Sequence, residues 1–577
     1  MFGDKLRWVI RPVVAEFPFF ILMTLLLDYR AFYWLLKYST EWCENWQQYP
    51  MLRFFSISLV YSFILTYIVY YTRKELIKAL FYTIAVSLLC IDVFLFISTH
   101  AIISTNSFLL LSETNLEEAR GFLLTYFYSL SGLLIMFLFV GLLLLCYFVE
   151  RLGTRWIIYY KHLPNKMQQC GLFILIFFLL GGLFSFRYYY ELFQCDTIEE
   201  ADEWSNRSMQ NADLITNIVF CMYDLKLAGG VLPKAEYQTK LVERTCPQLL
   251  WKEDSTDVIL VVGESFSKRH SSIYGYYLHT NPRLEREMSE GRLFAFTDVT
   301  SPYIFTSEAV RNIFSTNSIG DGEEWYDYPC FPAIFRQAGY SVLFWDNQYD
   351  MSSAAPYDFT LNAYLHGSAI ATQSYDVQHP SVSMYDADLV ADYHHYCLEH
   401  QISNPTFTIF HLQGQHFSTE ERYPQTPEFQ HFTADSIHRT EEWMTVDKKQ
   451  VIAHYDNCTF YNDYVLDQII SIFRDRCSVL VYLSDHGEDV FDTGDHLGRK
   501  VDSRQSYEIP FMIWCSDKYK ERHTIIVESI KKSVNKPLMS DNLCHLLMRL
   551  GGVNSVYYHE NRDVLSPQYQ SPSRNHY

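Results

Sequence analysis

Hydrophobic residues are concentrated in the first third of the chain, where they form long runs. A membrane-spanning helix needs about 20 predominantly apolar residues. Five runs before residue 190 meet this length and predict a bundle of five transmembrane helices. The first of them also contains Glu16, Asp28 and Arg30. The predicted spans are Val13–Leu36, Phe54–Tyr71, Leu80–Ile103, Phe122–Phe148 and Cys170–Phe186.

The chain after Asp257 has a different pattern, in which short runs of β-branched and aromatic residues alternate with helical stretches. Continuous apolar runs of this length are typical of strands buried on both faces of a parallel sheet. The alternation predicts an α/β domain whose mostly parallel sheet is covered by helices. The expected strands are Val258–Val262, Ser341–Phe344, Thr406–His411, Ser478–Leu483 and Phe511–Trp514, and two expected helices are Val451–Phe473 and Asp541–Leu550.

Charge divides the chain at the same place. Residues 1–190 carry a net charge of +4, and the remaining residues carry −24. An acidic domain argues against nucleic-acid binding, because that affinity comes from Lys and Arg that neutralise phosphates. We expect three parts: a five-helix transmembrane domain over 1–188, a polar connector over 189–256 and a soluble domain over 257–577.

Lysine and arginine are distributed unevenly around the predicted spans. They precede the first span, and they lie between the second and third and between the fourth and fifth, whereas the loop between the third and fourth is acidic. Loops rich in Lys and Arg stay in the cytoplasm. Five spans then place residues 190–577 outside, which in a bacterium is the periplasmic face of the inner membrane. The cations are Lys5, Arg7, Arg11, Arg73, Lys74, Lys78, Arg151, Arg155, Lys161 and Lys166.

Two of the expected strands end in residues that bind metals. One ends in Glu264 and Ser265, and another, about 220 residues later, ends in Asp485 and His486. In open α/β sheets, ligands lie at the carboxyl ends of the strands. We therefore expect these four residues around one point, where carboxylate oxygens and an imidazole nitrogen suit Zn²⁺ or Mn²⁺. A serine beside such an ion can be a metal-activated nucleophile.

Two loop histidines follow further strand ends. His416 comes shortly after the strand that ends near His411, and His496 follows the segment of Asp485. A single loop histidine is usually a surface residue, but four metal-competent segments that begin where strands stop indicate one site. The chain has 13 cysteines but no Cys-x-x-Cys motif, which disfavours a cysteine zinc site or a redox pair.

In combination, these segments resemble the alkaline phosphatase/sulfatase superfamily. With five preceding spans, the chain resembles the bacterial phosphoethanolamine transferases that modify lipid A and the lipopolysaccharide core. The matching segments keep the family's order over roughly the last half of the chain. They are Gly263-Glu264-Ser265, Ser271–Leu284, Thr306–Val310, Asp346-Asn347, Gly414-x-His416, Arg422-Tyr423-Pro424, Tyr455-Asp456-Asn457, Ser484–Glu488 and His496.

The resemblance implies an α/β sandwich of the alkaline phosphatase/sulfatase type that holds one or two Zn²⁺ ions, with Mn²⁺ as the alternative. It implies that Glu264, Ser265, Asp485 and His486 hold the catalytic zinc. Ser265 stands where the family has a threonine or serine nucleophile. Such an ion lowers the pKa of a hydroxyl and draws charge from phosphoryl oxygens.

The remaining roles also follow from the resemblance. His416 and His496 are implied to face the phosphoryl group, the leaving group or a second metal, where a histidine can pass a proton. Thr306 and Asn347 are implied to contact the substrate. Many lipid A enzymes have a lysine in the stretch that follows, and here that stretch begins with Gln348.

The acidic loop after the third predicted span adds a separate match. Thr114 and Glu118 have the spacing of a family threonine and glutamate that bind the lipid headgroup, and Leu110 stands at the position of a family asparagine. The Glu118 carboxylate suits an ethanolamine ammonium. A solvated loop or a helix cap is the alternative interpretation.

The leading hypothesis is a two-step transfer of phosphoethanolamine by a monomer. Ser265 attacks phosphatidylethanolamine, diacylglycerol leaves, and lipid A or a lipopolysaccharide core sugar takes the group from the serine. The alternatives are a phosphoglycerol transferase that acts on glucan or teichoic-type acceptors, and a membrane scaffold that has lost its activity. A sulfatase is disfavoured, because the segment Ser265–Arg269 lacks the proline of the C/S-x-P-x-R motif.

Overall fold

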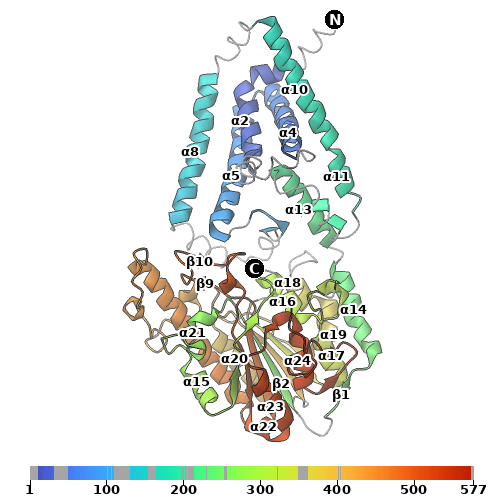
Figure 1. Cartoon of the computed structure of the whole chain (residues 1–577), viewed down its shortest axis with the longest axis vertical. Helices are drawn as coiled ribbons and strands as arrows, with labels where there is room; N and C mark the ends of the chain where they lie inside the picture. Colours follow the sequence, from blue (N-terminus) through green and yellow to red (C-terminus); the bar gives the residue numbers. More distant parts are fainter. Residues whose placement is uncertain are drawn as a thin grey trace. The chain divides into compact units, whose positions relative to one another are not determined.

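The computed structural model describes residues 11–30, 50–99, 102–105, 107–108, 130–153, 164–195, 200–201, 204–205, 213–228, 231–251, 256–320, 322–348, 361–400, 402, 405–416 and 418–572. The chain divides into two compact units (Figure 1). One comprises Met1–Leu111 and Leu123–Ala228, and the other comprises Ser112–Phe122 and Gly229–Tyr577. The predicted connector over 189–256 is thus shared between the two units.

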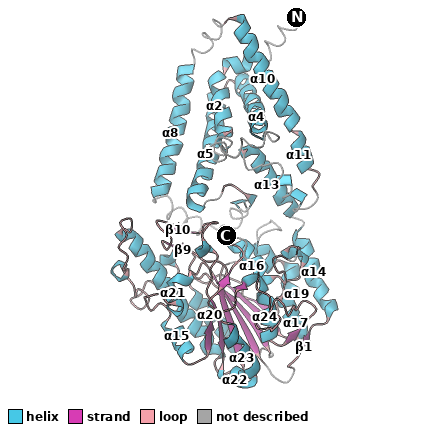
Figure 2. Cartoon of the chain, in the orientation of Figure 1, coloured by secondary structure: helices cyan, strands magenta, loops and turns pink. Residues whose placement is uncertain are grey.

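The second unit is built on a seven-stranded sheet with the order β3-β11-β8-β2-β7-β5-β6 (Figure 2). The pairs β8–β2, β2–β7, β7–β5 and β5–β6 are parallel, and β11 pairs antiparallel with β8 and β3. The sheet is therefore mostly parallel, and all five expected strands are present. The strands are β2 (Asp257–Gly263), β3 (Leu293–Ala295), β5 (Ser341–Asp346), β6 (Val377–Gln378), β7 (Thr406–His411), β8 (Ser478–Ser484) and β11 (Phe511–Cys515).

Six short strands form separate two-stranded pairs outside this sheet. The helices of the unit include both predicted ones, although the second begins with a 3₁₀ turn at Ser540–Asn542. The short strands are β1 (Gln248–Leu249), β4 (Val299–Thr300), β9 (Asp489–Val490), β10 (Leu497–Gly498), β12 (Leu538–Met539) and β13 (Val553–Asn554). The helices are α14 (Val231–Thr245), α15 (Pro282–Ser289), α16 (Thr306–Phe314), α17 (Pro332–Ala338), α18 (Leu361–His366), α19 (Ser368–Ser374), α20 (Asp386–Glu399), α21 (Val446–Phe473), α22 (Asp517–Arg522), α23 (Thr524–Ser533) and α24 (Leu543–Leu550).

Helices cover both faces of the large sheet, because its central strands are apolar on both sides. Two phenylalanines of β7 point to opposite faces of the sheet. Phe410 belongs to the core cluster that includes Tyr393 of α20 and Leu466 of α21. Phe407 points to the other face, where its ring stacks on Phe335 of α17 at a centroid distance of 4.3 Å. Burial on both faces explains why the strands are continuous apolar runs.

The first unit consists of apolar helices. By length and composition, five helices in the described part of the chain can cross a membrane: Phe55–Thr72, Glu75–Ile97, Gly132–Gly153, Lys166–Leu192 and Leu214–Thr245. The first four overlap the second to fifth predicted spans. The helices of this unit are α2 (Phe17–Leu27), α4 (Pro50–Thr72), α5 (Glu75–Thr99), α8 (Leu130–Gly153), α10 (Asn165–Ser185), α11 (Arg187–Leu192) and α13 (Leu214–Ala228).

Two segments differ from the predicted set of spans. Within the first predicted span, the described helix α2 is shorter than a full span, and residues 31–36 lie outside the described part. Conversely, Leu214–Thr245 lies in the predicted connector. Its apolar half is α13, whereas α14 carries Lys234 and Glu236 and belongs to the second unit. The apolar run of α13 is only 15 residues long, so the sequence pattern did not identify it as a span.

Helices α4 and α10 pack closely at Gly182. A Cβ atom added to Gly182 would lie 2.3 Å from the Ser56 carbonyl oxygen and 2.6 Å from Val60 Cγ2. Phe55 and Phe178 pack edge to face at the same contact, with ring centroids 5.4 Å apart. A small residue that lets two backbones approach is a common basis of helix association in membranes.

We expect Gly182→Ala to destabilise the first unit by about 1–3 kcal/mol, because the added methyl must displace backbone on α4. Gly171→Ala on the same helix is the control, since its added Cβ meets no described atom within 4 Å. The measurement is the thermal unfolding midpoint of the detergent-solubilised chain. Equal midpoints for the two variants would contradict this account of the α4–α10 contact.

Candidate metal centre and active site

The candidate site begins where β2 and β8 end. The two strands are parallel neighbours, with Gly263 opposite Ser484. The Asp485 N–H continues the pairing by donating to the Gly263 carbonyl at 3.0 Å. Both strands are buried along their whole length, and the first polar side chains after them are Glu264 and Asp485. Parallel pairing therefore delivers the two carboxyl groups to one edge of the sheet.

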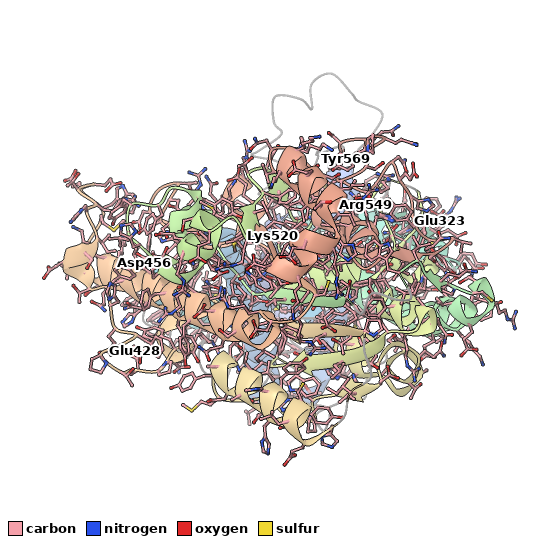
Figure 3. All side chains as sticks on the ribbon, turned by 90° about the horizontal axis from the view of Figure 1, so that it is seen from below. Glu323, Glu428, Asp456, Lys520, Arg549 and Tyr569 are labelled. Atoms are coloured by element: carbon pink, nitrogen blue, oxygen red, sulfur yellow. The ribbon has the colours of Figure 1, made fainter. Side chains whose placement is uncertain are left out.

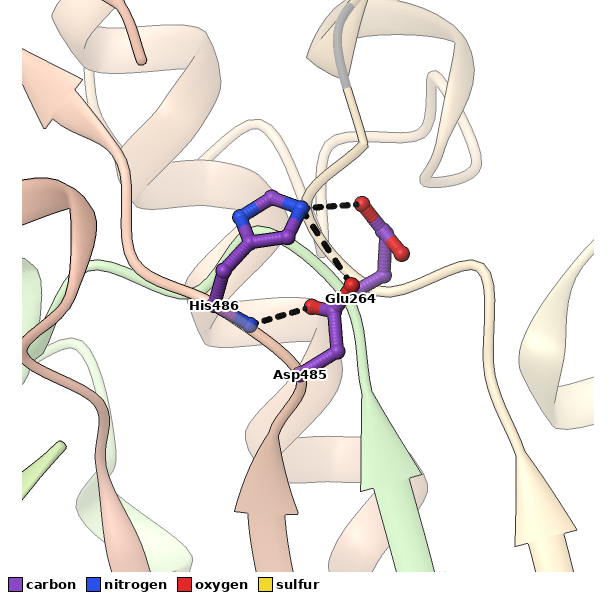
Figure 4. Close-up of side chains that lie close together, drawn as sticks. All are labelled: Glu264, Asp485 and His486. Carbon is purple, nitrogen blue, oxygen red and sulfur yellow. Dashed lines mark hydrogen bonds and ion pairs between the residues drawn. The ribbon is translucent and has the colours of Figure 1, made fainter. Parts of the chain in front are cut away.

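Glu264, Asp485 and His486 lie close together at this edge (Figure 4). Their ligand atoms all lie within 4.8 Å of one another. His486 Nε2 is 3.2 Å from Glu264 Oε1 and 3.2 Å from Asp485 Oδ2. All three side chains are fully buried. Among the described residues, this is the group of His, Cys, Asp and Glu side chains that can hold a metal ion.

The protonation of His486 turns a lone pair toward the two carboxyl groups. Its Nδ1 lies 2.9 Å from the Gly487 carbonyl oxygen, which only accepts, so Nδ1 carries the proton. Burial and the nearby Arg499 guanidinium lower the pKa of His486, which keeps the ring neutral. Nε2 is therefore free to coordinate a cation, in the tautomer that metal-binding histidines adopt.

Asp485 supplies the clearest sign that a charge is needed here. Its buried Oδ2 atom accepts no hydrogen bond from any described residue. Burial and the adjacent Glu264 carboxylate raise the pKa of Asp485 well above its usual range. Two buried carboxylates in contact cannot both ionise without a positive counter-charge. A divalent ion satisfies both of them together with the His486 lone pair.

Thr306, the first residue of α16, adds a fourth ligand atom. Its Oγ1 lies 3.3 Å from Glu264 Oε1, 3.2 Å from Glu264 Oε2 and 3.4 Å from His486 Nε2. Ligands that surround a tetrahedral zinc at about 2.0 Å are separated from one another by about 3.3 Å. The separations of His486 from Glu264, Asp485 and Thr306, and of Thr306 from Glu264, are close to this value, so these residues fit a tetrahedral zinc site.

Ser265 lies beside this set with a constrained backbone. Its φ is +54°, a left-handed conformation that is costly for a residue with a side chain. The Ser265 N–H donates to Asp485 Oδ1 at 3.1 Å, and its hydroxyl donates to Glu264 Oε1 at 2.8 Å. The Tyr455 hydroxyl donates to the Ser265 carbonyl at 2.6 Å. The side chain is buried, with 3% of its surface exposed.

The loop after β7 packs directly on Glu264. Gly414 has φ +51°, and a Cβ there would lie 2.7 Å from the Glu264 backbone nitrogen, so only glycine fits. The next residue, Gln415, donates its N–H to the Glu264 carbonyl at 2.9 Å. This approach brings His416 to the site. Burial lowers the pKa of His416 to about 3, and the charge of Glu264 opposes that shift, so the imidazole is neutral at neutral pH.

Two residues near the site were not predicted as site residues. Gln348 donates from Nε2 to Glu264 Oε2 at 3.3 Å and to the Leu412 carbonyl at 2.8 Å. Arg499 Nη1 lies 2.9 Å from His486 Nε2. No metal-binding motif contains either residue. Gln348 begins the stretch in which the sequence differs from the family it resembles, and Arg499 follows shortly after the predicted His496.

His496 lies in the β9–β10 hairpin. Its Nε2 is 3.2 Å from the Gly498 carbonyl oxygen, and its own carbonyl accepts from the Phe491 N–H at 2.9 Å. The hairpin also leads to Arg499. The role of His496 in proton transfer or in binding a second metal stays a prediction.

The other predicted substrate-binding residues have different positions. Asn347 is fully buried, and its amide donates to Asp386 Oδ1 at 2.8 Å and accepts from the Ser383 N–H at 2.6 Å. Both polar atoms of the Asn347 side chain are thus bonded to neighbouring residues, which gives Asn347 a structural role. Thr114 and Glu118 lie outside the described residues.

His270 is a buried histidine that helps to hold the segment after β2 against α21. His270 Nδ1 lies 2.7 Å from Asp456 Oδ1, and Asp456 lies on α21 (Figure 3). Tyr276 donates to the second oxygen of Asp456 at 2.9 Å. The His270 ring packs edge-on against Tyr455, whose hydroxyl holds the Ser265 carbonyl. The segment after β2 is therefore tied to α21 by charge and by hydrogen bonds.

Comparison with known proteins agrees with this fold. The sequence profile of the Sulfatase family matches residues 256–553, more than half of the chain. The chain belongs to the sulfatase family. The matched region begins one residue before β2 and ends in β13, so it contains every strand of the large sheet as well as Glu264, Thr306, Asp485 and His486.

Several members of this family are similar to the chain in sequence. Phosphoethanolamine transferase EptC of Escherichia coli K12 is 26% identical over 327 residues, which cover 55% of this chain and 54% of the relative. Phosphoethanolamine transferase EptA of Helicobacter pylori is 27% identical over 274 residues, which cover 47% and 49%. The chain therefore spans about half the length of the curated relatives it matches.

Two solved structures resemble the chain. The C-terminal periplasmic domain of E. coli EptC, in a complex with Zn, is 25% identical with a TM-score of 0.51, over 57% of this chain and 91% of that one. The integral membrane protein lipooligosaccharide phosphoethanolamine transferase A (EptA) of Neisseria meningitidis has a TM-score of 0.57 at 17% identity, over 96% and 97%. The second likeness confirms the predicted fold class, in which several helices of the described part are long and apolar enough to cross a membrane.

We expect the metal-free chain to bind Zn²⁺ through Glu264 and Asp485. Glu264→Gln or Asp485→Asn should weaken zinc binding at least about 100-fold, because each removes a charged ligand that the other ligands cannot replace. Isothermal titration calorimetry on the chelator-stripped chain measures both the affinity and the number of ions. Glu428→Gln is the control, since Glu428 is an exposed surface carboxylate (Figure 3).

An unchanged zinc affinity in Glu264→Gln would show that the carboxylates at the strand ends do not form the metal site. A second ion in the wild-type titration, lost in His416→Ala or His496→Ala, would identify these histidines as ligands of another metal.

The His270–Asp456 pair predicts a pH-dependent stability. Burial alone lowers the pKa of His270, but the Asp456 carboxylate outweighs burial and raises the pKa from 6.5 to about 10. The charged His270–Asp456 pair stabilises the folded chain fully below pH 6.5, and this stabilisation is lost as the pH rises through 10. His270→Gln should therefore lower the unfolding free energy by about 3 kcal/mol at pH 6 and by progressively less toward pH 10.

Chemical denaturation of both proteins across this pH range measures the difference. His395→Gln is the control, because the His395 side chain is 72% exposed. A difference that stays constant with pH would mean that His270 is not charged in the folded chain.

Proposed function

We propose that the chain is a zinc-dependent phosphoethanolamine transferase. It moves phosphoethanolamine from phosphatidylethanolamine to lipid A or to the lipopolysaccharide core. The observation that carries the proposal is the tetrahedral set of Glu264, Thr306, Asp485 and His486, which suits a zinc ion and includes a hydroxyl. The similar proteins named above are phosphoethanolamine transferases, which supports this headgroup and does not favour the phosphoglycerol alternative.

The geometry favours Thr306 over Ser265 as the nucleophile. The Thr306 hydroxyl completes the tetrahedral spacing with Glu264 and His486, whereas the Ser265 hydroxyl contacts Glu264 alone among the three cluster residues. Thr306 is half-buried, so a substrate can reach it, but Ser265 is 3% exposed. Thr306 also begins a nine-residue helix, whose N-terminus favours phosphoryl oxygens.

The first step joins the lipid phosphorus to the threonine. The Thr306 oxygen attacks the phosphorus of phosphatidylethanolamine, its proton passes to Glu264 Oε2 at 3.2 Å, and the bond from phosphorus to the diacylglycerol oxygen breaks. Diacylglycerol leaves as an alcohol after it gains a proton, for which His496 is the candidate donor, because His416 is neutral at neutral pH. A bound zinc lowers the pKa of the attacking hydroxyl and draws charge from the phosphoryl oxygens.

The second step is the reverse of the first with a different alcohol. An oxygen of lipid A or of a core sugar attacks the phosphorus, its proton passes to the histidine that protonated diacylglycerol, and the bond from phosphorus to the Thr306 oxygen breaks. Thr306 regains its proton, so the residue is unchanged after one cycle. The two steps give ping-pong kinetics.

The location that suits these substrates is the bacterial inner membrane. The positively charged loops between the predicted spans support a periplasmic location for the chain's second unit. Residues 257–577 are then the catalytic domain of a monomer, and Thr114 and Glu118 stay the candidates for binding the ethanolamine headgroup.

Thr306→Ala should lower phosphoethanolamine transfer at least about 1,000-fold, because it removes the attacking oxygen. Ser265→Ala keeps every ligand of the tetrahedral set and should lower transfer about tenfold or less. The assay supplies labelled phosphatidylethanolamine to the full chain in lipid vesicles and follows the label into lipid A and core by mass spectrometry. The acceptor fragment that gains one phosphoethanolamine identifies the second substrate.

Peptide mapping of the chain without acceptor locates the covalent group. Phosphoethanolamine on Thr306 supports the assignment, and phosphoethanolamine on Ser265 restores the serine predicted from the sequence. Transfer of phosphoglycerol, or of no headgroup at all, would contradict the proposed function.

A further inference from the structure

The loop after β5 contains no lysine or arginine between Asn347 and Thr360. Gln348 lies at the beginning of that loop, and its neutral amide donates to Glu264 and to the Leu412 carbonyl. A phosphoryl group in transfer carries negative charge on its non-bridging oxygens, and positively charged side chains commonly stabilise it. A positively charged side chain at this site therefore has to come from another element of the chain.

Arg499 brings a guanidinium to the metal ligands from the end of the β9–β10 hairpin. Its Nη1 lies 2.9 Å from His486 Nε2 and 3.3 Å from the Ile304 carbonyl oxygen. The guanidinium carbon also lies over the Phe305 ring, 5.7 Å from the ring centroid. Ile304 and Phe305 immediately precede Thr306, so Arg499 is anchored on the segment that carries the proposed nucleophile.

The contact between Arg499 and His486 excludes a metal on the same atom. His486 Nε2 has one lone pair, because Nδ1 holds the proton. That lone pair accepts from Arg499 or coordinates an ion, but not both. When an ion takes it, the guanidinium loses this acceptor and keeps the Ile304 carbonyl and the Phe305 ring. It then has N–H donors to spare and stays anchored on the two residues that precede Thr306.

We infer that Arg499 binds the non-bridging oxygens of the transferred phosphoryl group. The inference rests on the proposed function and adds to it the residue that supplies the positive charge. The planar guanidinium presents paired N–H donors that match two phosphate oxygens, a geometry that lysine does not offer. Arg499 thus contacts His486 and the segment that leads to Thr306, where it is positioned to bind a phosphoryl group.

The inference predicts that Arg499 is needed to bind phosphate but is not needed to bind zinc. Arg499→Gln should weaken binding of inorganic phosphate to the zinc-loaded chain about tenfold or more, because a charge-assisted donor pair is lost. It should leave zinc binding in phosphate-free buffer unchanged or stronger, because the competing donor on His486 is gone. Arg499→Lys keeps the charge but not the paired donors, and should bind phosphate with intermediate affinity.

Isothermal titration calorimetry on the full chain measures both affinities, with zinc titrated first and phosphate second. Arg504→Gln is the matched control in the same segment, since Arg504 pairs with Glu508 and its side chain is 58% exposed. The thermal unfolding midpoint of each variant shows that it is folded.

Unchanged phosphate affinity in Arg499→Gln overturns the inference and leaves the proposed function intact. Loss of zinc binding in the same variant also overturns it, because Arg499 then only holds the metal site in shape. If the wild-type chain binds zinc but no phosphate, both the inference and the phosphoryl-transfer function are wrong. Weaker phosphate binding together with intact zinc binding supports the inference.

Discussion

The convergence of buried groups that need a positive charge is the constraint on which the site depends. Parallel pairing of β2 and β8 brings Glu264 and Asp485 to one edge of the sheet. The hydrogen bond from His486 Nδ1 to the Gly487 carbonyl then directs a lone pair toward them. Groups of this kind stay together in a protein interior only when a cation compensates them. The negative charge of the two carboxylates makes the site costly to bury, and the same charge makes the site favour a divalent cation.

The surrounding structure holds this arrangement in place from several sides. Gly414 lets the loop after β7 contact the Glu264 backbone, and no other residue fits there. Tyr455 fixes the left-handed turn at Ser265 through a bond to its carbonyl. Strained backbone at a functional site persists only when its neighbours restrain it. Ser265 therefore has a clear structural function, since its N–H orients Asp485 and its hydroxyl contacts Glu264.

The sequence predicted the features that depend on a single strand or a strand end. Glu264 and Asp485 were found because each directly follows a continuous apolar run, and parallel strands end at a common edge. The contact of Thr306 with Glu264, 42 residues away in the chain, depends on how α16 is placed, which no local pattern contains. Arg499 was missed for the same reason. The helix α13 was missed because 15 apolar residues are fewer than a span requires.

The apolar core of the second unit is built without the residues of the metal site. In many small zinc domains, the ion supplies the folding free energy, and the chain unfolds without it. Here the apolar core extends from β2 and β8 to α20 and α21 without any metal ligand among its members. The guanidinium of Arg499 lies 2.9 Å from His486 and brings a positive charge near the carboxyl groups. A zinc ion at this site would therefore serve the chemistry of the chain far more than its folding.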